Sequence, residues 1–128
     1  MLGIKDAEHE ESSPDASRLI ISKLVCSLNG KTETVKIIPG TLAHRVYGKE
    51  ETVEEFRCNY GLNPEYQNRF VDGKLVVAGI DVDGQFRIIE LPERRFFVAT
   101  LYLPQLLSKP NAPHSLIVAY LKSASKGW

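Results

Sequence analysis

Residues that could act as a nucleophile, base or metal ligand are scarce in this chain, which has two cysteines and three histidines. Cys58 follows Arg57, and a cationic neighbour favours the reactive thiolate form of a cysteine. We favour the alternative, a small buried strand residue, because free cysteines are usually buried. Cys26 and Cys58 form no Cys-x-x-Cys pattern. A reducing, cytoplasmic location is therefore predicted, with neither a disulfide scaffold nor a thiolate zinc site.

Two of the histidines are candidates for a chemical role. His9 lies in the acidic segment 6–11, but a hard-cation site needs an ordered turn that this segment does not supply. We therefore read it as a solvated acidic tail and expect no metal and no cofactor. His114 precedes the expected final helix and has no acid near it in sequence. This pattern favours a capping or packing role over a catalytic one.

Two short segments have plain structural interpretations. Residues 79–84 contain two glycines, but no helix and no Lys-Ser/Thr pair follows them, so they are not a phosphate loop. Asp83 and Gly84 instead predict a tight turn between two strands. The pair Arg94 and Arg95 is interpreted as a solvated turn.

The elements that must position these residues are mostly strands. Thr41 is expected to cap a short helix that ends before Gly48, and Ser115 to cap a final helix. Asn63 and Pro64 predict the start of another helix that ends at Gly73. Alternating or apolar runs predict strands at residues 19–25, 33–38, 53–60, 74–81, 85–91 and 95–102.

Length and charge describe an ordinary soluble domain. The chain has 128 residues, with 16 basic and 16 acidic side chains, so it favours neither nucleic acid nor a membrane as a partner. The N-terminal segment has no basic n-region and no h-region, so it does not predict a signal peptide. We expect residues 1–17 to be an irregular acidic lead-in and residues 18–128 to be one domain.

Four blocks carry a resemblance to a known family: PGTLAHRVYGKEE, FRCNYGLN, LVVAGIDVDGQFRIIELPERRFFVATLYLPQ and HSLIVAYLKSA. In this order and spacing they resemble the C-terminal half of a class I glutamine amidotransferase domain, in the version found in CTP synthase. Stand-alone proteins related to the C-terminal region of CTP synthase are similar as well. The resemblance implies an α/β fold, flavodoxin-like with three layers and present as the later half only. Its sheet would be mixed, with a β-hairpin and about three helices.

The resemblance also implies a catalytic triad that this chain lacks. The family hydrolyses glutamine with an elbow cysteine, a histidine base and a glutamate that orients the histidine. Its His-Pro-Glu falls at Leu103, Pro104 and Gln105. Leu103 has no lone pair, and Gln105 is neutral. Residue 1 matches a position beyond the nucleophile helix, so we expect no catalytic residue in this chain.

The substrate-binding block of the family is altered too. Its Arg-His-Arg-Tyr falls at Arg57, Cys58, Asn59 and Tyr60, and an asparagine cannot make the bidentate clamp on a carboxylate that an arginine makes. We expect a cleft for a small polar ligand near these four residues and the altered triad positions, Leu103 and Gln105.

Two functions remain open at this point. The first is a catalytically inactive relative of the glutaminase domain that works as a binding or assembly module. The second is one part of an amide-hydrolysing enzyme whose nucleophile is on a separate N-terminal half. The family's central parallel sheet takes its inner strands from that half. An open edge would invite pairing, so we expect a homodimer or a docked half-domain.

Overall fold

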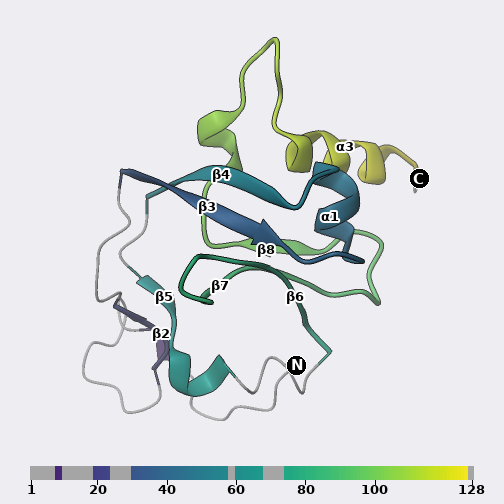
Figure 1. The fold of residues 1–128 in the computed structure, drawn as a ribbon. Helices are drawn as coiled ribbons and strands as arrows, with labels where there is room; N and C mark the ends of the chain where they lie inside the picture. Colours follow the sequence, from purple (N-terminus) through teal and green to yellow (C-terminus); the bar gives the residue numbers. More distant parts are fainter. Residues whose placement is uncertain (1–7, 10–18, 24–29, 58–59, 68–73, 127–128) are drawn as a thin grey trace.

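The computed structural model describes residues 8–9, 19–23, 30–57, 60–67 and 74–126 (Figure 1). Within these ranges there are two α-helices, α1 (Leu42–Tyr47) and α3 (Ser115–Lys126). There are also two short 3-10 helices, η1 (Pro64–Tyr66) and η2 (Pro104–Leu107), and Gln67, directly after η1, is helical as well. The helices α1 and α3 lie against each other at one end of the main sheet.

The main sheet is antiparallel and has five strands in the order β4-β3-β6-β7-β8. Its strands are β3 (Lys31–Ile37), β4 (Glu51–Phe56), β6 (Val76–Ile80), β7 (Phe86–Glu90) and β8 (Val98–Thr100). A second sheet, in the order β1-β2-β5, contains β1 (Glu8–His9), β2 (Leu19–Lys23) and β5 (Tyr60–Leu62). Because β1 and β2 are parallel and β2 and β5 antiparallel, the predicted mixed α/β architecture is confirmed.

The strand predicted at residues 53–60 is two strands in two sheets, so this prediction was wrong. The first strand, β4, ends at Phe56 and pairs with β3, whereas β5 begins at Tyr60 and pairs with β2. Phe56 is buried in the main core, and Leu62 in a second, smaller core. The sequence could not show the break because the alternation of side chains is the same in both strands. The strand predicted at residues 95–102 is confirmed only at its centre, as β8.

The hairpin between β6 and β7 is confirmed. Asp81 Oδ1 accepts the backbone N–H groups of Asp83 and Gln85, both at 2.9 Å. Gly84 has a φ of 79°, which lies in the left-handed region that glycine adopts without strain. Asp81 Oδ2 also accepts two hydrogen bonds from Arg87, at 3.1 and 2.9 Å, so one carboxylate ties the turn to the next strand.

The predicted limits of α1 are confirmed as well. Thr41 Oγ1 accepts the N–H of His44 at 3.1 Å, and Gly48 ends the helix with a φ of 67°. The helix starting at Ser115 needs a correction, since Ser115 is its first residue and not its cap. His114 Nδ1 accepts the N–H of Leu116 at 3.1 Å, so His114 has the capping role predicted for it.

The helix predicted at residues 63–73 is η1 in its first turn, where Asn63 Oδ1 accepts the N–H of Glu65 at 3.1 Å. Residues 68–73 lie outside the described ranges. Most of the predicted lead-in, residues 1–17, lies outside them as well, so that boundary stays a prediction. In the parts of the chain that are described, no helix has the length and apolar character needed to cross a membrane.

Candidate functional site

Arg57 and Leu103, two of the residues predicted to line a cleft, lie in one pocket. Arg57 follows β4, Leu103 follows β8, and together with residues 100–102 they line a cavity of about 180 Å³. The side chain of Arg57 is 54% exposed and pairs with Glu55 at 3.2 Å. A surface pair of this kind holds the guanidinium only weakly, so Arg57 remains available to a ligand.

Leu103 is the residue that the resemblance matches to the family's histidine base, and that match stays a prediction. Leu103 follows β8, precedes η2 and is 38% exposed, and its N–H points to the carbonyl of Glu55 at 3.5 Å. Gln105 lies inside η2 with an exposed side chain, and it is not part of the pocket lining. The structure therefore brings Arg57 and Leu103 together at this pocket and places Gln105 outside its lining.

The other predicted cleft residues are described less fully. Cys58 and Asn59 lie outside the described ranges, and Tyr60 is described only by its backbone in β5. Their places in a cleft remain predictions. His9 is likewise described only by its backbone in β1, where it pairs with Ile21.

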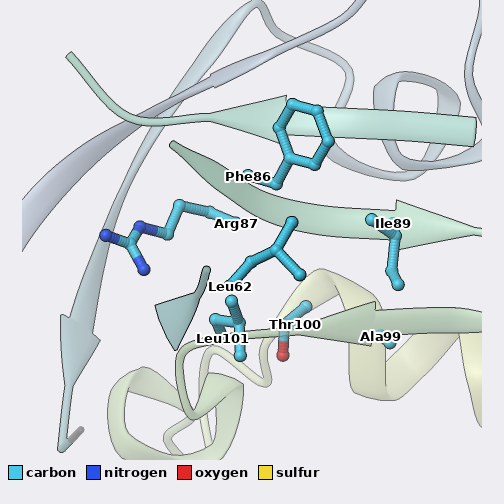
Figure 2. A pocket seen from close by; sticks show the side chains of 7 residues that line it. All are labelled: Leu62, Phe86, Arg87, Ile89, Ala99, Thr100 and Leu101. Atoms are coloured by element: carbon cyan, nitrogen blue, oxygen red, sulfur yellow. The ribbon is translucent and has the colours of Figure 1, made fainter. Parts of the chain in front are cut away.

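A second, apolar pocket adjoins the first (Figure 2). It has a volume of about 100 Å³ and shares Thr100 and Leu101 with the pocket of Arg57. Leu62 of β5 faces it, with Phe86 and Ile89 of β7 on another side. Among the lining residues that the structure describes, Arg87 turns its charged end to Asp81 and Thr100 donates its hydroxyl to the carbonyl of Tyr102. The pocket offers an apolar surface next to the end of β8.

The groups best suited to proton transfer are buried elsewhere. His114 Nε2 lies 2.6 Å from Glu54 Oε1, and these residues are only 8% and 1% exposed. Because His114 Nδ1 accepts a backbone N–H, the ring hydrogen is on Nε2 and is donated to Glu54. The hydroxyl of Tyr47 lies 3.3 Å from the same nitrogen and 2.8 Å from the hydroxyl of Tyr102.

This network connects Tyr47 of α1 and Glu54 of β4 to the residues that follow β8 and precede α3, and its role is structural. Burial raises the pKa of Tyr47 and the pKa of Tyr102 above their ordinary value of 10.0, so both phenols stay protonated at neutral pH. A histidine with an acid behind it is the pair that many hydrolases use. Here both ring nitrogens of His114 already have partners, so the pair holds α3 to β4.

The alternation of side chains along β4 is a signal in the sequence for a buried Glu54. Thr52, Glu54 and Phe56 occupy alternate positions of β4, and all three are buried. A carboxylate in line with a buried phenylalanine needs a polar partner. That partner, His114, lies 60 positions further along the chain, so spacing alone could not identify it.

The chain is similar to known proteins over nearly its whole length. No model of a known protein family matches the chain. CTP synthase of Carboxydothermus hydrogenoformans is 36% identical over 97% of this chain, and CTP synthase of Saccharolobus solfataricus is 34% identical over 98% of it. The chain is a CTP synthase-related region. It spans about a quarter of the length of each of these relatives, since the matches cover 25% of both.

The fold agrees with this relationship. The glutaminase domain of Trypanosoma brucei CTPS, a structure with bound acivicin, superposes with a TM-score of 0.89 and 20% sequence identity. The match covers 98% of this chain and 53% of that one. The CTP synthase-related chain therefore has the fold of about half of a glutaminase domain, and the predicted glutamine amidotransferase-like fold is confirmed.

Proposed function

We propose that this chain is a catalytically inactive relative of the CTP synthase glutaminase domain and works as a binding or assembly module. The observation that carries the proposal is Leu103, an aliphatic side chain in the wall of the pocket at the end of β8. An amide hydrolase needs a base within hydrogen-bond reach of its nucleophile. Leu103 cannot serve as one, and Gln105 would bring no charge to orient a base.

The pocket retains what binding requires. Arg57 supplies a cation with only a weak surface partner, and the adjoining apolar pocket supplies walls from β5, β7 and β8. A cation beside an apolar surface suits a small polar ligand that carries a carboxylate. We place the module in the cytoplasm because its two cysteines form no Cys-x-x-Cys pattern.

Ammonia release from glutamine by the purified chain tests the loss of catalysis. We expect no release above a buffer blank, while a glutaminase assayed in parallel gives a clear signal. The double variant Leu103→His/Gln105→Glu should be equally inactive, because neither Cys26 nor Cys58 has the setting of an elbow nucleophile. Turnover that persists in the pure protein and falls in Arg57→Ala would contradict the proposal.

Ligand binding is tested separately. Glutamine and acivicin serve as probes in a thermal-shift measurement, with Tyr60→Ala, Gln105→Ala and Arg57→Ala as variants. Lys109→Ala, an exposed cation outside the pocket lining, is the control. We expect a stabilising shift that Arg57→Ala and Tyr60→Ala reduce and the control retains. Gln105→Ala, at a side chain outside the lining, should reduce it only if the ligand extends beyond Leu103. A shift that all four variants retain would place the ligand elsewhere.

A second candidate is favoured by the length of the structural match. The matched region is 53% of a glutaminase-domain chain, so a separate polypeptide equivalent to the rest could dock and bring a nucleophile. Co-expression with the N-terminal half of a CTP synthase glutaminase domain tests this candidate. A stable complex that releases ammonia from glutamine would favour the enzyme over the binding module.

A further inference from the structure

A larger hollow lies between α1 and the turn that joins β7 to β8. Its volume is about 380 Å³, and its lining includes Arg45 of α1 together with Arg94 and Arg95 of the turn. None of its lining residues belongs to the pocket of Arg57. The hollow is therefore a separate place on the protein, and ligand binding there is independent of the proposed function.

The three guanidinium groups of this hollow are available. All three side chains are exposed, and within the described ranges none has an ion-pair or side-chain hydrogen-bond partner, because the ion pairs there involve other cations. Like charges that share a small space repel one another. An arginine cluster of this kind gains most from an anion that all its members can reach.

Glu90, the acid in the lining, is already engaged. It is 4% exposed, and its two carboxylate oxygens accept the N–H groups of Leu42 at 2.8 Å and Ala43 at 3.2 Å. Glu90 thus occupies the first amides of α1, and a ligand must use the arginines instead. With three cations and one anion the lining has a net charge of +2, although the whole chain is formally neutral.

We propose that this hollow binds a small organic phosphate. The guanidinium fork matches phosphate oxygens in two parallel hydrogen bonds, so three arginines suit a dianionic group better than a single carboxylate. Phe97 and Val76 line the same hollow and are 39% and 38% exposed. They offer an apolar wall for the ligand's ring or carbon skeleton. The volume is within the range of small-molecule sites.

Calorimetric titration at low ionic strength tests the proposal with four probes. They are adenosine monophosphate, adenosine, ribose 5-phosphate and inorganic phosphate. We expect the monophosphate to bind about tenfold or more tightly than adenosine, because hydrogen bonds to charged groups dominate. It should also bind more tightly than the two probes without a base ring. Its affinity should fall as salt is added.

Variants separate this site from general attraction of anions. Arg94→Gln/Arg95→Gln should weaken the monophosphate about tenfold or more, and Arg45→Gln should weaken it in the same direction. Lys109→Gln/Lys122→Gln removes equal charge from exposed residues outside the lining and should leave the affinity unchanged. Because the arginines are exposed, all these variants should keep the parent melting temperature, which a thermal scan checks.

Three results would overturn the proposal. If none of the phosphate probes binds, the hollow is not a phosphate site. Equal losses of affinity for the monophosphate in the double arginine variant and the double lysine variant would show that the protein attracts anions without a specific site. Equal affinity for inorganic phosphate and for the two organic phosphates, with no effect of Phe97→Ala, would show that the hollow does not recognise an organic phosphate.

Discussion

Glu54 shows how one side chain can join distant parts of this fold. Its carboxylate is buried among apolar neighbours of β4, and it accepts hydrogen bonds from His114 and from the hydroxyl of Thr52 at 3.1 Å. His114 in turn caps α3, and its own N–H donates to Ser108 Oγ at 3.0 Å. The start of α3 is therefore fixed by polar contacts, whereas Leu116 fixes it by apolar packing.

Loss of His114 should be among the more damaging single changes. His114→Ala leaves Glu54 buried without its main partner and removes the cap of α3, so we expect it to lower the free energy of unfolding by about 3 kcal/mol or more. His44→Ala is the matched control, because in the described ranges the His44 side chain has no hydrogen bond. Urea unfolding followed by circular dichroism measures both. Similar midpoints for the two variants would show that the network contributes little.

The coupling between the two residues can be measured directly. In the double variant Glu54→Leu/His114→Leu no buried charge is left unpaired, so its loss of stability should be smaller than the sum of the single losses. Strict additivity in the same urea experiment would mean that Glu54 and His114 act independently.

The two buried tyrosines predict a loss of stability at high pH. Burial raises the pKa of Tyr102 in the folded state above its ordinary value of 10.0, so below pH 10 the folded and unfolded chains are protonated alike. Above pH 10 the Tyr102 side chain ionises only in the unfolded chain, so this one group should lower stability by up to about 1.4 kcal/mol per pH unit. Tyr102→Phe should make this fall shallower, whereas Tyr120→Phe, at an exposed ring, should not. Unfolding midpoints between pH 8 and pH 11 measure the difference.

At the scale of elements, the main sheet depends on a close approach between β6, β7 and β3. The register of β6 against β7 shifts on both sides of Gly79. A Cβ atom at Gly79 would stand 2.6 Å from Ile88 Cδ1 and 3.0 Å from Val35 Cγ1. Both neighbours are fully buried. Glycine is therefore required here for space, in contrast with the turn at Gly84.

Gly79→Ala should consequently destabilise the sheet by about 1–3 kcal/mol, the usual cost of overpacking a core. Ile88→Ala removes both side-chain atoms that the new methyl group would meet, Cδ1 at 2.6 Å and Cγ1 at 2.7 Å. The double variant Gly79→Ala/Ile88→Ala should therefore be more stable than the sum of the single effects predicts. Thermal unfolding of the four proteins completes the cycle, and additive losses would show that the clash is relieved in another way.

At the scale of the whole molecule, β8 is an edge of the five-stranded sheet. The N–H of Leu101 bonds to Arg87 and the carbonyl of Phe97 to Leu91, so alternate residues of this segment face β7. The backbone groups of Val98 and Thr100 then point away from β7. The apolar pocket of Figure 2 lies beside this edge. An edge strand next to an apolar surface invites pairing with another chain.

We therefore predict a homodimer, with a docked half-domain as the alternative partner. Light scattering at micromolar concentration should give about twice the mass of 14.3 kDa. Thr100→Pro removes an outward N–H and should shift the protein to monomer. Thr100→Val also lacks the hydroxyl but keeps the N–H, so it should remain dimeric. A folded wild-type monomer would contradict the prediction that the edge at β8 pairs with another chain.

Local structure could be predicted from the amino-acid sequence alone. The cap at Thr41, the end of α1 at Gly48 and the turn at Asp81 were predictable because their hydrogen bonds join residues within four positions. Whatever the fold, the Leu103 side chain cannot act as a base, and the Gln105 side chain has no negative charge. The likeness to a glutaminase domain was also readable from the order and spacing of four sequence blocks.

Only the folded chain shows which distant side chains meet. The division of residues 53–60 between two sheets depends on where the chain changes neighbours, and alternation is the same on either side of the break. Glu54 and His114 come together only because β4 packs near the start of α3. Arg45 lines the same hollow as Arg94 and Arg95 because α1 lies beside the turn after β7. These residues are about 50 or more positions apart in the chain, and a linear pattern does not show which of them are close in space.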